Sequence, residues 1–318
     1  MKKNIYLLLI LFLINFSLKS QNKFEFIESE EQLLKKYLKQ IFNSRDDLEK
    51  KKLNKKVLNI FSFILSDEIS FEYPFDSLQF VGIHKSSDNL MRIYNWNLAY
   101  NDGSFEYFGF VQYFAKESSS VFSKKKMVLY TLTDRSRKIK NPEFKKLSNI
   151  NWFGALYYEI VVNKYKKQTF YTMIGWDGND NFSNKKVIDV IYFTEDKSLH
   201  FGSNIFDFDN KDKKKKKKSK RRKKKKKEEK IFYRLIYEFS QKARMTLHYN
   251  KEKKIIVFDY LTPPSSVYEG EYQYYGPDGF SYDSFVFRNG KWRYKPDVEL
   301  RNPKKEANKR KSKNKIKD

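Results

Sequence analysis

The sequence predicts a mainly β protein, in which an antiparallel meander, forming a sandwich or an open barrel-like sheet, is preceded by an amphipathic helical hairpin. Two observations support this fold class. Residues 28–67 repeat apolar side chains at helical spacing, and from Ser70 onward short runs of Phe, Tyr, Ile and Val are separated by turn residues. No helical pattern alternates with these runs, which argues against a parallel α/β sheet.

The helical hairpin is predicted from two start signals. Ser29 with Gln32 has the spacing of a capping box, and Ser44 with Asp47 repeats the signal. Apolar residues at helical spacing follow each of them: Leu33, Leu34, Tyr37, Leu38, Ile41 and Phe42, then Leu48, Leu53, Val57, Ile60, Phe61 and Ile64. We expect this apolar stripe to pack on the β domain, and docking on a membrane surface or a partner is the alternative.

The β region is predicted to contain strands separated by polar turns. The expected strands cover residues 79–84, 90–100, 105–115, 127–132, 155–162, 169–176, 186–193, 231–239, 245–249, 255–261, 271–275, 281–288 and 291–294. Two of them, 187–193 and 255–260, are apolar on both faces and are expected inside a sandwich or under the helices. Asp189 and Asp259 interrupt these runs, either as functional carboxylates or as acceptors for backbone and tyrosine hydrogen bonds.

The last hairpin is predicted in detail. Asn289-Gly290 favours a two-residue type I′ turn, because both central residues adopt positive φ at low cost. This turn places Phe287 opposite Trp292 and Phe285 opposite Tyr294, so two aromatic pairs share one face.

The first twenty residues have the pattern of a secretory signal peptide. Lys2 and Lys3 precede an apolar run from Ile5 to Phe16, and Ser20 offers a small residue for cleavage. The run is shorter than the roughly 20 residues that span a bilayer, so we expect no transmembrane helix in the mature chain. We therefore expect an exported protein, periplasmic, extracellular or associated with the envelope.

The positive charge is concentrated in segments outside the expected fold. Of the net charge of +27, residues 213–227 carry +14, residues 304–318 carry +6 and the N-terminal lysines carry +3, so the rest of the chain carries +4. We expect a disordered basic loop at 211–230 and a disordered basic tail at 302–318. The predicted organisation is thus a signal peptide (1–20), a helical segment (21–69) and a β domain (70–301) that contains the loop.

The basic loop is a candidate surface for anionic lipid or polysaccharide, although a tolerated lysine run without any role is the alternative. Export argues against nucleic acid as the partner. The residues of this candidate surface are Lys213, Lys214, Lys215, Lys216, Lys217, Lys218, Lys220, Arg221, Arg222, Lys223, Lys224, Lys225, Lys226 and Lys227.

Several chemistries lack the residues that they need. The absence of cysteine excludes disulfides, thiolate metal sites and cysteine nucleophiles. His84, His200 and His248 are far apart in sequence and lack metal-ligand spacing, and Gly279-Phe280-Ser281-Tyr282-Asp283 lacks the closing glycine of a nucleophile elbow. Gly276-Pro277-Asp278-Gly279 is typical of a tight turn. We expect no cofactor.

One loop resembles a calcium site in part. Asp177, Asn179 and Asn181 occupy the spacing of the first three oxygen ligands of a calcium loop. Phe182 and Ile188 then stand where such a loop has its glycine and its terminal glutamate. The alternative is a hairpin turn of Asx residues.

Three segments resemble a family of exported bacterial envelope proteins of unknown activity: Asn151-Trp152-Phe153-Gly154-Ala155-Leu156-Tyr157-Tyr158, Ile174-Gly175-Trp176-Asp177-Gly178-Asn179-Asp180, and Tyr275-Gly276-Pro277-Asp278-Gly279-Phe280-Ser281-Tyr282-Asp283. The resemblance covers most of the mature chain except the basic tracts. It implies export and a single folded unit, and it implies no catalytic residue.

Two functions follow from these observations. The first is an exported β-rich binding or scaffolding module of the cell envelope, without an identifiable catalytic constellation and with an unknown envelope partner. The second is a secreted carboxylate-based hydrolase or carbohydrate-binding enzyme that uses acids and tryptophans. A cleft with two convergent acids and a tryptophan platform would favour the second function, and a well-filled sheet without a cleft would favour the first.

Overall fold

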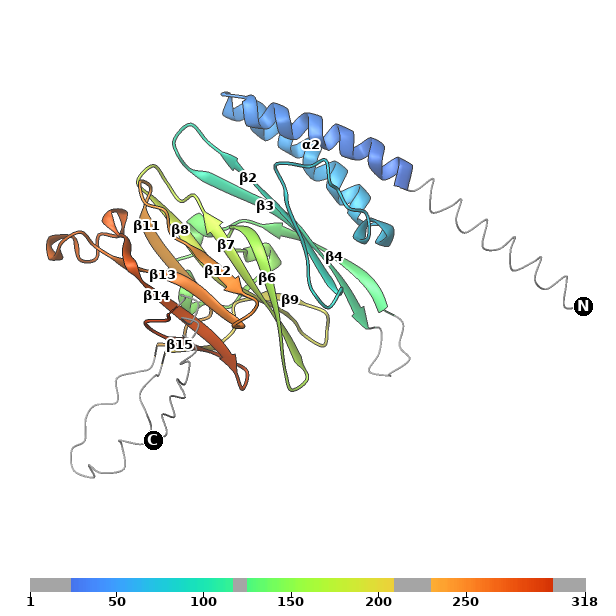
Figure 1. The fold of residues 1–318 in the computed structure, drawn as a ribbon. Coiled ribbons are helices and arrows are strands. Elements are labelled where there is room, and N and C mark those ends of the chain that lie inside the picture. Colours follow the sequence, from blue (N-terminus) through green and yellow to red (C-terminus); the bar gives the residue numbers. More distant parts are fainter. Residues whose placement is uncertain (1–23, 117–124, 209–229, 300–318) are drawn as a thin grey trace, which may run out of the picture.

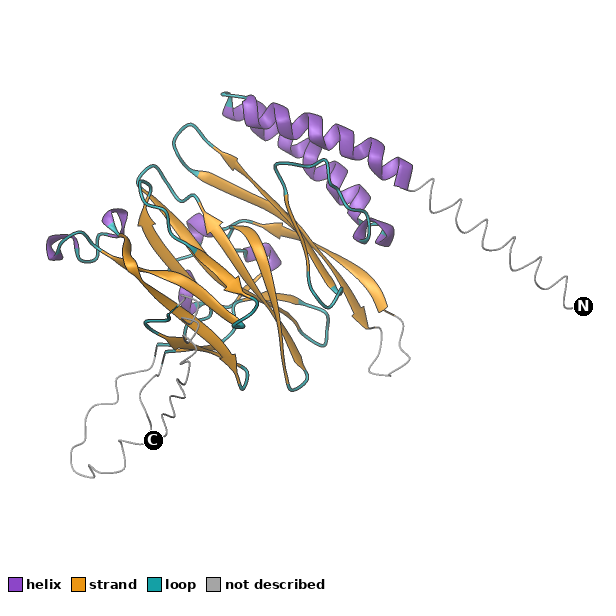
Figure 2. Cartoon of the chain, in the orientation of Figure 1, coloured by secondary structure: helices purple, strands orange, loops and turns teal. Residues whose placement is uncertain are grey.

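The computed structural model describes residues 24–116, 125–208 and 230–299 (Figure 1). Two N-terminal helices are followed by antiparallel sheets that form no closed barrel within these residues, which confirms the predicted fold class (Figure 2). The predicted signal peptide, the basic loop and the basic tail lie almost entirely outside the described residues. In the described part of the chain, no helix is long and apolar enough to cross a bilayer.

The helical hairpin consists of a first helix, described over residues 24–43, and α2 (Asp47–Leu65). The first helix covers residue 24 onward, so the predicted cap at Ser29 is wrong: the Ser29 hydroxyl lies inside the helix and donates to Phe26 O. The second predicted cap is displaced by two residues. Asp46 caps α2 by accepting from Leu48 N at 2.8 Å, while the Ser44 hydroxyl donates to the Glu49 carboxylate.

The first sheet has the order β1-β2-β3-β4, formed by β1 (Gly82–Lys85), β2 (Met91–Ala99), β3 (Phe105–Lys116) and β4 (Lys125–Thr133). Alternation along β2 divides its side chains between two layers. Tyr94, Trp96 and Leu98 pack against the helices, where Trp96 Nε1 donates to Asn54 Oδ1 at 2.7 Å. The apolar stripe of the hairpin therefore covers this sheet, as expected, but Leu33, Phe42 and Leu48 of the predicted stripe are exposed instead.

The second sheet lies on the other face of the first. Its strands are β5 (Leu147–Ser148), β6 (Leu156–Tyr165), β7 (Gln168–Asp177), β8 (Ser183–Phe193), β9 (Leu199–Phe201) and β11 (Leu235–Ser240). They pair in the order β5-β9-β8-β7-β6, and β11 adds to the N-terminal half of β8. Met91 and Ile93 of β2 share a core with Tyr157, Met173 and Ile191 of this sheet.

The third sheet closes the stack. Its strands are β10 (Phe206–Asp207), β12 (Leu247–Asn250), β13 (Ile255–Thr262), β14 (Gly276–Arg288) and β15 (Lys291–Lys295), in the order β10-β15-β14-β13-β12. A core that includes Ile174, Ile188, Ile256, Phe285 and Trp292 joins it to the second sheet. The described chain is therefore a stack of one helical layer and three sheets (Figure 2).

The last hairpin has the predicted register. Asn289 and Gly290 have φ of 52° and 76°, and the turn joins β14 to β15. Phe287 pairs with Trp292 and Phe285 with Tyr294.

Three local predictions differ clearly from the structure, and three short strands were not predicted. The strand predicted at 271–275 is wrong, because Tyr272–Tyr274 form a short 3-10 helix. The strand predicted at 231–239 begins at Leu235. The turn predicted at 276–279 lies inside β14, where Gly279 has φ of 83° and the Asp278 carboxylate accepts from Phe280 N. The short strands β5, β9 and β10 were not predicted, because two or three residues show no period.

A buried ion pair ties the second sheet to its flanking loops. Arg234 and Asp189 are both fully buried, and Arg234 Nε donates to Asp189 Oδ2 at 3.0 Å. Arg234 Nη1 also donates to the carbonyls of Pro142 and Lys145. Asp259 accepts from Thr246 N at 2.6 Å. Both carboxylates that interrupt apolar strands therefore have structural partners.

Candidate functional site

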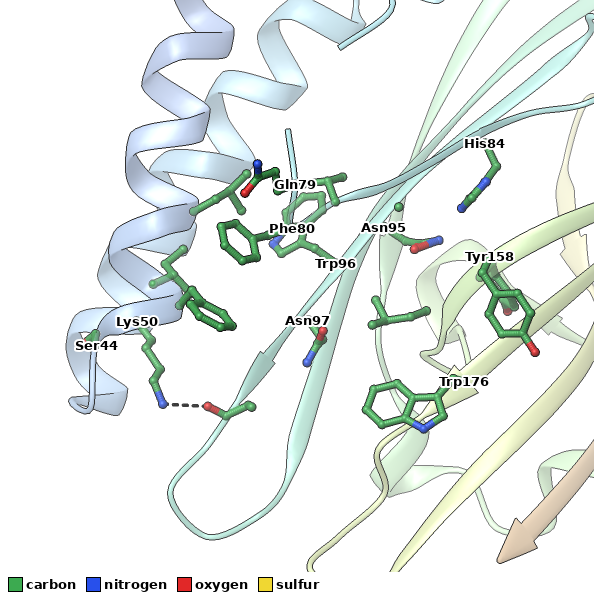
Figure 3. Close-up of a pocket in the computed structure, with 18 residues that line it drawn as sticks. Ser44, Lys50, Gln79, Phe80, His84, Asn95, Trp96, Asn97, Tyr158 and Trp176 are labelled. Carbon is green, nitrogen blue, oxygen red and sulfur yellow. Dashed lines mark hydrogen bonds between the residues drawn. The ribbon is translucent and has the colours of Figure 1, made fainter. Parts of the chain in front are cut away.

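A cleft with a volume of about 650 Å³ opens between the helical hairpin, one end of the first sheet and one end of the second (Figure 3). This size is typical of a small-molecule site. Its walls are formed by Leu38, Ile41, Phe42, Ser44, Lys50, Gln79, Phe80, Val81, Gly82, His84, Asn95, Trp96, Asn97, Ala99, Leu156, Tyr157, Tyr158 and Trp176.

The side-chain amide of Asn95 is the most unusual group of this cleft. Asn95 is fully buried in β2, and neither its oxygen nor its nitrogen has a hydrogen-bond partner among the described residues. A buried polar group without a partner costs about 1–3 kcal/mol. Such a group in a cleft wall is therefore a candidate contact for a ligand or a bound water.

Two glycines make room for this amide. Asn95 pairs with Gly82 of β1 on one side and with Gly109 of β3 on the other. A Cβ atom at Gly82 would lie 2.7 Å from Asn95 Oδ1 and 3.2 Å from Tyr157 O, so a side chain there would press on the amide. The amide therefore stands between two positions without side chains.

His84 lies beside the amide, on the same side of the first sheet (Figure 3). Burial lowers the pKa of His84 from its ordinary value of 6.5, and a hydrogen bond to the backbone of Tyr157 opposes part of this effect. The imidazole is therefore neutral at pH 7, where it adds no charge to the cleft.

Aromatic side chains provide the apolar surface of the cleft. Half-buried Trp176 comes from β7, and Tyr158 from β6 is held by a hydrogen bond from its hydroxyl to Leu247 O at 2.7 Å. On the helical side, Phe42 stacks on Phe80 with ring centroids 4.7 Å apart. The cleft thus combines aromatic faces with a few polar groups.

Lys50 is the one side chain with a full charge among the described residues that form these walls, and two of its three N–H donors already have acceptors. Lys50 Nζ donates to Ala99 O at 2.7 Å and pairs with Asp47 at 3.0 Å. No carboxylate is among the residues that form the walls of this cleft. The convergent acid pair of a glycoside hydrolase is therefore not found here, although a tryptophan is present.

A second, more polar cleft of about 410 Å³ contains carboxylates, each of which already accepts a hydrogen bond. Asp47 accepts from Asn101 N, Asp102 from Ser104 N, and Asp134 from Tyr107 N; the Tyr100 hydroxyl donates to Glu106. The Asn101 N–H lowers the pKa of Asp47, and hydrogen bonds from Ser104 lower that of Asp102. A general acid needs a raised pKa, so these two carboxyls do not fit that role.

The three residues of the calcium-like loop have protein partners. Asp177 accepts from the Tyr107 hydroxyl at 2.8 Å and from Asn179 N at 2.9 Å, and burial raises the pKa of Asp177. Asn179 Oδ1 accepts from Lys185 Nζ at 2.6 Å, whereas the Asn181 amide donates to Asp102 O. The ammonium group of Lys185 is therefore already hydrogen-bonded to one of the oxygens that would have to bind a calcium ion. The calcium site stays a prediction.

The other candidate residues are dispersed. His84 lies at the large cleft, His200 stacks on Tyr192 in the second sheet, and His248 lies on β12. Within the described ranges, no group of three His, Asp or Glu side chains is placed to hold a metal ion. The residues of the basic surface, 213–227, lie outside the described residues.

Sequence reasoning missed Asn95 and its two glycine neighbours. A signal was present, because Asn95 and Asn97 follow Met91 and Ile93 on one face of the strand, and that face is otherwise apolar. Pattern alone does not show whether a polar residue at such a position has a partner.

The comparisons with known proteins assign no function to this cleft. No family model, no curated protein and no solved structure matches the chain. The resemblance to exported envelope proteins therefore stays untested, and the functional argument rests on the cleft.

Proposed function

We propose that this chain is an exported, β-rich binding module of the cell envelope, and that it holds a small neutral chemical group in the cleft between its first two sheets. The unpartnered amide of Asn95 carries this proposal. An unpaired buried group destabilises the empty protein, and a bound ligand offsets this loss because it supplies the missing hydrogen bonds.

The composition of the cleft supports binding over hydrolysis. Trp176 suits both functions, but the wall residues include no carboxylate that could act as acid or nucleophile. The secreted hydrolase is therefore the weaker proposal. Export and contact of the basic tracts with anionic surfaces also remain proposals, and they rest on the sequence patterns alone.

Site-specific crosslinking in the native envelope tests the binding function. A photoreactive phenylalanine analogue placed at Phe80, on the cleft wall, is expected to capture a molecule. The same analogue at Phe63, exposed on α2 but not part of the cleft wall, is the matched control. Capture that is specific to position 80 and lost in an Asn95→Leu background supports the proposal. Equal capture at both positions, or no capture at position 80, contradicts it.

Export is tested separately by cell fractionation and N-terminal sequencing. We expect a mature protein in the envelope or the medium that begins at Gln21, after cleavage behind Ser20. A cytoplasmic protein that begins at Met1 would contradict the envelope assignment and leave the cleft chemistry unaffected.

A further inference from the structure

We infer that the cleft ligand is a neutral carbohydrate, with an adjacent pair of sugar hydroxyls on the Asn95 amide and a sugar ring against the aromatic wall. This inference rests on the proposed binding function and names the ligand class for the same cleft. Its grounds are the hydrogen-bonding capacity of the amide, the charge of the walls and the nature of the apolar surface.

The amide matches hydroxyl groups because it both donates and accepts. Asn95 offers one carbonyl oxygen and one NH₂ group side by side, and both lack partners in the described structure. Two neighbouring hydroxyls of a sugar ring offer a donor and an acceptor at a similar separation. Gln79 and Asn97 add two further amides to the same walls.

The walls select against a charged ligand. Lys50 already binds Ala99 O and Asp47, and burial keeps His84 neutral at pH 7. No carboxylate faces the cleft. An ammonium group on the ligand would lose its hydration without gaining an opposite charge, because no carboxylate lines the cleft. A ligand carboxylate would meet only Lys50, whose charge is already paired with Asp47, so its desolvation is poorly compensated as well. Desolvation of hydroxyl groups costs less free energy, because hydrogen bonds to the amides of the cleft replace the hydrogen bonds that the hydroxyls made to water.

Partly exposed aromatic rings supply a surface for the C–H face of a sugar ring. Trp176 is half-buried and is held edge-on by Phe105, with ring centroids 5.6 Å apart. Tyr158 is 37% exposed and is held by its hydroxyl and by Lys186 over its ring. Both rings are fixed before a ligand arrives, which reduces the ordering cost of binding.

Binding requires a small local opening. Asn95 has no exposed surface, so a ligand reaches its amide only when a neighbouring side chain moves aside. We therefore expect the ligand to associate more slowly than it would with a site that is open from the start.

The test combines a ligand series with matched variants of the full mature chain. The probes are a panel of neutral disaccharides that includes cellobiose, maltose, lactose and N,N′-diacetylchitobiose, and two charged disaccharides of the same size, cellobiuronic acid and the deacetylated chitobiose. Titration calorimetry is expected to show binding of at least one neutral disaccharide and at least tenfold weaker binding of both charged sugars. No binding within the neutral panel, or preference for a charged sugar, overturns the inference.

Asn95→Leu is expected to weaken binding at least tenfold and to keep or raise the Tm of the empty protein, because an apolar isostere removes two unpaired polar atoms. Asn163→Leu is the control: Asn163 Oδ1 is also buried without a partner among the described residues, but it lies on β6 away from the cleft wall. It should leave binding unchanged. If Asn95→Leu binds normally, or its Tm falls by several degrees, the amide is a structural group and the inference fails.

The crosslinking at Phe80 separates the two proposals. A captured peptide or apolar molecule would overturn the carbohydrate inference and leave the binding function standing. The absence of any captured molecule would contradict both.

Discussion

At the scale of single residues, we expect His84 to make the stability of the protein depend on pH. Burial lowers the pKa of His84 below 6.5, so the folded protein binds this proton more weakly than the unfolded chain does. The stability that neutral His84 contributes is fully present above about pH 6.5, and it decreases as the pH falls from there toward the lower pKa of the folded state.

We therefore expect Tm to fall between pH 7 and pH 5, and to fall less in His84→Gln, which cannot take up a proton. Glutamine retains an N–H that can donate to the Tyr157 carbonyl, so the variant is expected to fold. Thermal unfolding of both proteins across this range checks the prediction. Parallel curves for the wild type and the variant would show that another group controls the acid response.

At the scale of elements, the final hairpin depends on its turn and on one contact outside it. Gly290 has φ of 76°, and a Cβ atom there would lie 2.4 Å from the ring of Tyr165 at the end of β6. The turn thus sets the register of β14 and β15 and also seats the hairpin against the second sheet.

We expect Gly290→Ala to destabilise the protein by more than about 1 kcal/mol, and so to lower Tm by at least about 2–4 °C. Gly279→Ala is the matched control, because Gly279 has φ of 83° but nothing lies within 4 Å of its Cβ position. Both substitutions place a side chain at a residue with positive φ and so strain the backbone. Only Gly290→Ala also adds a close contact with Tyr165. An equal fall in Tm for the two variants would show that the contact with Tyr165 does not contribute to the loss of stability.

At the scale of the whole molecule, we expect the basic loop to be separable from the fold. Fourteen of its fifteen residues from Lys213 to Lys227 are Lys or Arg, and consecutive like charges oppose compact packing. Deletion of Lys213–Lys227 is therefore expected to change Tm by no more than a few degrees, because it removes charged side chains and no apolar side chain. A larger fall in Tm would show that the loop is structural.

The same deletion tests the proposed anionic contact. Full-length protein is expected to bind vesicles containing phosphatidylglycerol at 0.1 M salt, since each lysine near an anionic surface contributes about 1 kcal/mol. Binding should be lost at 1 M salt, where the Debye length falls from ~10 Å to ~3 Å, and in the deletion variant at either salt concentration. Binding that persists at 1 M salt or in the deletion variant would place the contact on the folded body.

What the sequence predicted was mostly local. The apolar period indicated the helical hairpin and its packing on the β region, and Asn289-Gly290 predicted the pairing of Phe285 with Tyr294. The strand predicted at 271–275 failed because aromatic residues favour strands only where they find a sheet to pack in. Tyr272 and Tyr274 instead lie half-exposed in a short 3-10 helix.

The sequence by itself determined the fold class, most of the strands, the turn of the last hairpin and the segments that carry the charge. Each of these depends on neighbours within a few positions along the chain. Only the tertiary structure decided how three sheets stack, that Arg234 meets Asp189, and that Asn95 lies unpartnered between Gly82 and Gly109 at a cleft. These features depend on contacts between residues far apart in the sequence. A pattern along the sequence does not show whether a polar atom has a hydrogen-bond partner in the folded chain.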